Sequence, residues 1–280
     1  MKHTIKNKKD GKRIILEIVL VILTIFMLVP IYYLVVTTFK TPEQATANPM
    51  GLPTSINFKA YVDAWKLMEY PRVFKNNLII TGTAVFGVVM LSAMAAYPIA
   101  RRRHKLNKIV FFIFLTGIMV PYQMAVIPIY KLMISLKLMN KLAGVILIDI
   151  FINVPFAVFL FRGFISTIPI ELEEAASIDG CGIFKVFWRV TFPLLKPVIA
   201  TVIILNSLNI WNDFLTPLLF LQSREKDVIL QEVYRNIGQF SIDWTSFFPM
   251  MVLGVAPLVI FYVFMQKYII KGIASGAVKG

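Results

Sequence analysis

The stretch Glu174-Ala-Ala-Ser-Ile-Asp-Gly180, followed by Pro193 beyond a short basic segment, is the most informative part of this chain. It is a polar loop between two long apolar runs. Pro169 and the carboxylates after it stand where a helix begins, since acidic side chains favour the positive end of the helix dipole. Gly180 then allows a sharp bend. The loop therefore predicts a short helix, a turn and a second short helix, which is the shape of a docking element.

The spacing within this loop resembles the EAA motif of permease subunits of ATP-binding-cassette (ABC) importers. The usual motif ends Ile-x-Leu-Pro, whereas this chain has Val190 and Phe192 before the proline. The resemblance implies that the loop docks the ATPase subunits. The residues that it assigns to this coupling role are Glu174, Ala175, Ala176, Asp179, Gly180 and Pro193.

The composition is that of a membrane protein, with 58% hydrophobic residues and a mean hydropathy of +0.75. A helix needs about 20 apolar residues to cross a bilayer. Such runs predict six transmembrane helices and an all-α integral membrane fold, at roughly 14–39, 77–100, 109–134, 142–162, 198–221 and 247–270. Pro121 and Pro128 interrupt the third run, and we expect a kink there because neighbouring helices can satisfy the freed carbonyls.

The net charge of +14 is unevenly distributed along the chain. Basic residues cluster in the segment 1–13, in the loop 101–108, in the loop 163–197 and in the tail 271–280. The positive-inside rule places these four segments, and so both termini, in the cytoplasm. Residues 14–280 are then one six-span transmembrane domain, with 163–197 as its cytoplasmic coupling loop. Basic clusters beside spans are orientation signals, so we expect no nucleic-acid partner.

The sequence contains no recognisable nucleotide-binding or metal-binding motif. It lacks a G-x-x-x-x-G-K-[ST] phosphate loop, and one cysteine with two histidines cannot form a typical zinc site. We therefore expect no enzyme activity, no metal and no cofactor in this chain. ATP and Mg²⁺ would be bound by partner ATPase subunits.

Polar residues inside the predicted spans are candidates for a solute pathway. In the fifth span Asn206, Asn209 and Asp213 fall on one face of a continuous helix, together with Thr216. In the fourth span, Asp149 and Asn153 are one turn apart. Counting 1.5 Å per residue puts the two carboxylates in a common layer. Hydrogen bonding between helices is the alternative role for all these side chains.

Further segments extend the resemblance to permeases of maltose-type carbohydrate importers. They are Trp211-Asn-Asp-Phe214 with Pro217-Leu-Leu-Phe220, Asn153-Val-Pro-Phe156 with Arg162-Gly-Phe164, and the C-terminal run 266–280. The resemblance implies the type I ABC importer fold in a prokaryotic plasma membrane. It also implies import of sugars, and of oligosaccharides in particular. The implied partners are a second permease, two ATPase subunits and an extracellular solute-binding protein.

Other functions leave different signatures. The EAA-like loop is shared by importers of other small polar solutes, so a non-sugar substrate stays open. A secondary transporter would need coupling-ion residues and an internal repeat, which is not evident. A channel would need a filter or a ring of like residues.

Overall fold

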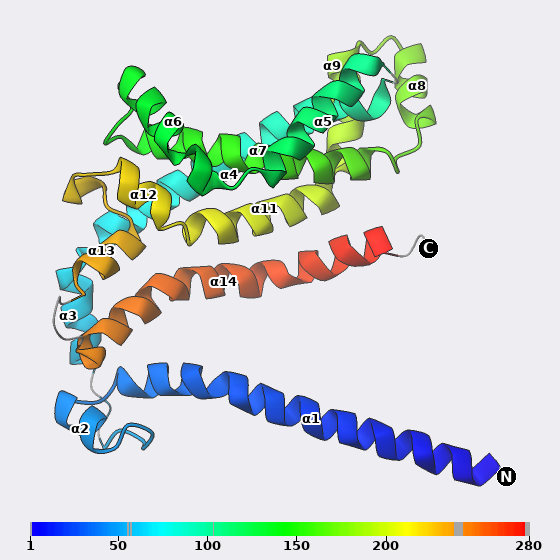
Figure 1. Cartoon of the computed structure of the whole chain (residues 1–280). Helices are drawn as coiled ribbons and strands as arrows, with labels where there is room; N and C mark the ends of the chain where they lie inside the picture. The colour runs from blue at the N-terminus through cyan, green and yellow to red at the C-terminus, as the bar shows by residue number, and fades with distance from the viewer. Residues whose placement is uncertain (1, 55, 57, 103, 238–242, 278–280) are drawn as a thin grey trace. The chain divides into compact units, whose positions relative to one another are not determined.

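The computed structural model describes residues 2–54, 56, 58–102, 104–237 and 243–277 (Figure 1). Every regular element in these ranges is helical, which confirms the predicted all-α class. Four helices are long and apolar enough to span a membrane, within Arg13–Thr37, Tyr70–Arg101, Leu142–Ile165 and Trp244–Gln266. Two bent helix pairs raise the number of spans to six if each pair is one span.

The chain forms two compact units, which we describe separately. One comprises Met1–Met68 with Asn236–Leu253, and the other Glu69–Arg235 with Gly254–Gly280. The last helix, α14 (Trp244–Ala277), runs from the first unit into the second. The predicted tail at 271–280 is helical as far as Ala277, and its last three residues lie outside the described residues.

The first unit contains α1 (Lys2–Thr37), α2 (Pro42–Ala47), α3 (Lys59–Leu67) and the start of α14. Thr38 accepts a hydrogen bond from the Tyr61 hydroxyl at 2.9 Å, which ties the end of α1 to α3. The buried Lys40 donates to the carbonyls of Asn48 and Pro49. These contacts order the connection between α1 and α3.

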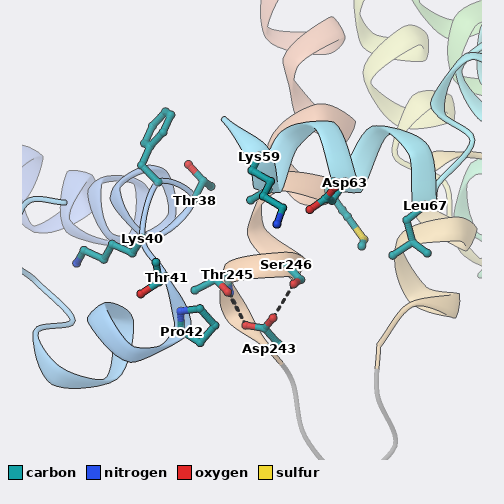
Figure 2. A pocket seen from close by; sticks show the side chains of 14 residues that line it. Thr38, Lys40, Thr41, Pro42, Lys59, Asp63, Leu67, Asp243, Thr245 and Ser246 are labelled. Carbon is teal, nitrogen blue, oxygen red and sulfur yellow. Dashed lines mark hydrogen bonds between the residues drawn. The ribbon is translucent and has the colours of Figure 1, made fainter. Parts of the chain in front are cut away.

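Asp243 caps the start of α14 in a polar pocket of this unit (Figure 2). Its Oδ1 accepts from the amide and hydroxyl of Thr245, and its Oδ2 accepts from the Ser246 hydroxyl at 2.6 Å. Burial by itself would raise the pKa of Asp243, but these hydrogen bonds outweigh it and hold the pKa below its usual value. The charged carboxylate therefore stabilises this helix end.

The second unit is built on α4 (Tyr70–Arg101) packed against α7 (Leu142–Ile165). Small side chains fill the contact, including the fully buried Ala93, Ala96 and Ala157. Ser92 donates from its hydroxyl to the Val154 carbonyl at 3.3 Å. Small residues let membrane helices approach closely, so this pair forms the core of the unit.

Among the described residues, ten further helical segments lie wholly within this unit. They are α5 (Lys105–Met119), α6 (Tyr122–Ser135), α8 (Glu171–Ile178), α9 (Ile183–Val186), the π-helix η1 (Phe187–Thr191), α10 (Phe192–Leu194), α11 (Lys196–Trp211), α12 (Leu215–Phe220), the 3₁₀ turn η2 (Arg224–Lys226) and α13 (Ile229–Arg235). Figure 1 shows α8 and α9 at one end of the unit and α12 with α13 at the opposite end.

The third predicted span is broken rather than kinked. Helices α5 and α6 meet at an angle of 104°. Val120 precedes Pro121 and is extended, with φ −80° and ψ 116°, because a residue before proline is driven out of the helical region. The expectation of a kink was wrong at Pro121, whereas Pro128 is accommodated inside α6.

The fifth predicted span is also interrupted. Helix α11 ends at Trp211, and α12 begins four residues later. A continuous helix would set the Pro217 ring against the Asp213 carbonyl four residues earlier. Asp213 instead turns and accepts a hydrogen bond from the Thr216 amide at 3.2 Å. The prediction that Asp213 and Thr216 continue one helical face with Asn206 and Asn209 was therefore wrong.

A network of charges ties α13 and η2 to the start of α4. The fully buried Glu232 pairs with Arg72 at 3.1 Å and with Arg224 at 2.7 Å. Asp227, equally buried, pairs with Arg235 at 2.8 Å. Burial raises the pKa of Asp227 although Arg235 acts in the opposite direction. The charged segment after α12 is thus a packed part of this unit.

We predict that Asp243→Ala lowers the free energy of unfolding by about 0.5–2 kcal/mol, the usual cost of losing an N-cap. Asp243→Asn keeps an acceptor oxygen and should stay close to wild type. Because the folded pKa is lowered, the contribution of this carboxylate is complete above its unfolded pKa of about 3.9 and is lost as the pH falls through the folded value. Denaturant unfolding of the detergent-solubilised chain measures both effects, and equal stability of wild type and Asp243→Ala would contradict the capping role.

Candidate functional site

A polar cavity of about 380 Å³ lies between α6, α7 and the break after α11. It brings together four of the five residues predicted for a solute pathway, namely Asp149, Asn153, Asn209 and Asp213. The fifth, Asn206, is buried outside the cavity and donates to the Val202 carbonyl one turn earlier. The two carboxylates therefore share one site, although Asp213 reaches it from a turn rather than from a helix.

Hydrogen bonds fix the amides of this cavity. Asn209 on α11 donates to the Asn153 side-chain oxygen on α7 at 2.8 Å, and Asn153 donates to the Asp149 carbonyl at 2.7 Å. The Asp149 side chain is 3% exposed. Within the described residues its Oδ2 has no hydrogen-bond partner. Since a buried polar atom without a partner is costly, this oxygen is available to water or to a bound hydroxyl.

Residues at both helix breaks line the cavity. Tyr122 stands at the first turn of α6 and lines it, and so do Asn212 and Asp213 in the turn after α11. Non-helical backbone at membrane depth is tolerated only where it is buried in protein or lines a water-filled space. Tyr122 could not be assigned to this cavity from the sequence, because its position depends on the break at Pro121.

The EAA-like loop forms the predicted helix–turn–helix. Glu171, Glu173 and Glu174 occupy the first turn of α8. Gly180 has a φ of +82°, a left-handed conformation that favours glycine. The bend leads through α9 into the π-helix η1, where Phe187, Trp188 and Phe192 pack ring against ring.

Most of the predicted coupling residues lie on the outside of this loop. Glu174, Ala175, Asp179, Gly180 and Pro193 are exposed, and Ala176 is half-buried. Large apolar side chains are exposed beside them, with Ile178 at 87% and Phe184 at 74%. The loop therefore presents an uncovered surface of apolar and acidic groups.

Glu173 holds the loop onto α4, and sequence reasoning did not single it out. Its carboxylate is buried and accepts from Tyr97 at 2.9 Å and from Thr191 at 2.8 Å. It also forms an ion pair with Arg101 at 2.8 Å. The partners on α4 lie more than seventy residues away in sequence, so no local pattern distinguishes Glu173 from its neighbours Glu171 and Glu174.

The segment that carries the cavity and the loop has known relatives. Residues 88–275 match the family of binding-protein-dependent transport system inner membrane components. The chain belongs to this family. It is accordingly a multi-pass membrane permease subunit and not an enzyme, as the sequence predicted.

Individual relatives of this permease cover nearly its whole length. The melibiose/raffinose/stachyose import permease protein MelC of Bacillus subtilis is 35% identical over 253 residues, which are 90% of this chain and 91% of MelC. The multiple sugar-binding transport system permease protein MsmG of Streptococcus mutans is 34% identical, over 91% of this chain and 93% of MsmG. A bacterial ABC transporter involved in the import of the acidic polysaccharide alginate has the same fold in its crystal structure. Its TM-score is 0.82 at 24% identity, covering 91% of this chain and 95% of that one.

We predict that Glu173→Ala destabilises the permease by about 3–5 kcal/mol, because it leaves Arg101 buried without its counter-charge. Glu174→Ala is the matched control, since Glu174 is the exposed neighbour on the same helix turn. It should change stability by less than about 0.5 kcal/mol. Thermal unfolding of the purified chain measures the difference, and equal melting temperatures for the two variants would argue against an anchoring role for Glu173.

Proposed function

We propose that this permease is one of two membrane subunits of an ATP-driven, binding-protein-dependent sugar importer. The cavity around Asp149 and Asp213 is the observation that carries the proposal. Among the described residues, its lining offers carboxylates, amides and hydroxyls but no basic side chain. Carboxylate and amide oxygens accept hydrogen bonds from hydroxyl groups, so the site suits a neutral, hydroxyl-rich solute. The substrates named for MelC and MsmG support the same class.

In this proposal the loop from α8 to α10 docks an ATPase subunit, which binds the ATP and Mg²⁺. The exposed Ile178 and Phe184 supply apolar contact area. The anchored Glu173 makes the loop move with α4. A second permease completes the pathway, a second ATPase subunit serves that permease, and an extracellular solute-binding protein delivers the sugar. Both termini and the coupling loop would then face the cytoplasm.

Uptake by the reconstituted importer tests the proposal. The complete set of subunits is placed in vesicles, with melibiose, raffinose, an amino acid and inorganic phosphate as alternative solutes. We expect ATP-dependent uptake of an oligosaccharide after sodium and proton gradients are collapsed. Uptake that stops with those gradients would identify a secondary transporter, and uptake of only the amino acid or phosphate would exclude a sugar importer.

We predict that Asp213→Ala lowers sugar uptake by about ten- to a hundredfold, the loss expected for hydrogen bonds to a charged group. Basal ATP hydrolysis and complex assembly should persist. Asp213→Asn should do less harm because the amide keeps an acceptor oxygen. Asn206→Ala is the control, since it removes a polar side chain of α11 that does not line the cavity. A large fall in melting temperature with normal uptake per assembled complex would assign Asp213 to helix packing instead.

Docking is tested separately from transport. We predict that Phe184→Ala weakens association with the ATPase subunit by about tenfold or more, as truncation of a central aromatic contact does. Glu174→Lys should weaken it through charge reversal on the same surface. Glu225→Lys reverses an exposed charge in η2, which contacts the start of α4 rather than the end that holds the loop, and should have no effect. Co-purification of the ATPase subunit measures the association, and wild-type recovery with both loop variants would exclude this docking surface.

A further inference from the structure

A second cavity, of about 500 Å³, lies where the ends of α4, α5 and α7 meet. Three cationic side chains line it: Arg102 from the end of α4, Lys108 from the first turn of α5 and Arg162 from the last turn of α7. No acidic side chain is among the described residues of its lining. None of the three cations forms an ion pair within the part of the chain that the structure describes. The cavity therefore concentrates positive charge without a protein counter-charge.

The position of Arg162 is set by its neighbours. Its guanidinium carbon lies 4.0 Å from the centre of the Phe111 ring. Its Nε is buried and has no hydrogen-bond partner in the described chain. An oriented guanidinium with an unused buried donor is suited to a phosphate, which it can bind through two parallel hydrogen bonds.

Asn107, another residue of the cavity lining, connects α5 to α4. The Asn107 amide donates to the carbonyls of Pro98 and Arg102, at 3.0 and 2.9 Å. These bonds tie the start of α5, next to Lys108, to the end of α4, which carries Arg102. Contacts within the fold therefore position the helix ends that carry the three cations.

The cavity wall continues onto a surface that suits acyl chains. Phe112 lines it and is 62% exposed. Ile109 and Ile113, its neighbours on α5, are exposed as well, and α5 belongs to a candidate span. A soluble phosphate would gain nothing from this apolar side. A lipid could place its phosphate among the cations and its chains along α5.

We propose that this cavity binds the headgroup phosphate of an anionic phospholipid. Basic pockets between the ends of membrane helices recognise such headgroups, and each cation near the surface contributes to the attraction. The proposal requires only that the chain spans a membrane. It does not depend on the identity of the transported solute.

The test uses the full-length permease in nanodiscs, with phosphatidylglycerol and phosphatidylcholine as the two probes. A photoactivatable analogue of each lipid is crosslinked, and the modified peptides are mapped by mass spectrometry. We expect the phosphatidylglycerol probe to label residues 99–112 and the peptide containing Arg162, and the phosphatidylcholine probe to label them far less. Equal labelling by both probes would overturn the proposal.

Charge-removing variants give the second measurement. Arg162→Gln should weaken phosphatidylglycerol binding by about fivefold, and the double variant Arg102→Gln/Lys108→Gln by about twenty-fivefold, at about 1 kcal/mol for each basic residue. The control Lys105→Gln/Lys185→Gln removes two exposed charges that do not line the cavity and should leave binding unchanged. If the control variant lost as much phosphatidylglycerol binding, the losses would reflect the net charge of the protein and not this cavity. Inorganic phosphate at millimolar concentration is tested as a competitor of the lipid probe. If it competes as well as unlabelled phosphatidylglycerol does, the cavity binds a soluble anion instead. The crosslinking of the wild-type chain decides the question even if a variant fails to fold.

Discussion

The close packing of α4 on α7 is the constraint on which the rest of the second unit depends. Small side chains such as Ala93, Ala96 and Ala157 lie among the fully buried residues of this contact and let the two backbones approach. Gly87 shows how close they come, since a Cβ at this position would meet the Ile150 side chain at 2.5 Å. The same two helices carry most of the polar chemistry. Helix α7 holds Asp149 in one cavity and Arg162 in the other, and α4 supplies Arg101 and Tyr97 to the buried Glu173.

This arrangement connects the two ends of the unit mechanically. The EAA-like loop is fixed to α4 by a buried carboxylate with three partners. Helix α4 in turn packs along α7, which bears the cavity carboxylate Asp149. In the proposed importer, a force applied to the loop by a docked ATPase subunit would pass to α4 and from there to the packed α7. This is the physical requirement for coupling a docking event to a change at the polar cavity.

Much of this fold could be predicted from the sequence, because the strongest signals are local. The apolar runs locate the spans, the carboxylates after Pro169 locate the start of α8, and Gly180 locates the bend. The breaks in two spans were missed. Hydropathy does not register the exclusion of Val120 from the helical region or the clash of Pro217 with the preceding turn. The orientation of the termini and the roles of the individual site residues stay predictions.

The site was predictable only in part for a related reason. Asp149, Asn153, Asn209 and Asp213 do share a cavity, although the helical face used to group Asp213 with the others does not exist. Asp213 lines the cavity because the turn after α11 changes the direction of the chain. The burial of Glu173 and the placement of Tyr122 depend on residues distant in sequence, and a single sequence contains no measure of such contacts.

The two interrupted helices have a consequence for the permeability of the membrane. Unwound backbone beside Tyr122 and Asp213 lines the polar cavity, and such backbone is tolerated at membrane depth where it borders a water-filled space. Such a space would let ions leak if it opened to both sides at once. The proposed importer therefore requires one side to be closed at every moment, and the barrier that protects the ion gradients would be the same barrier that makes solute access alternate.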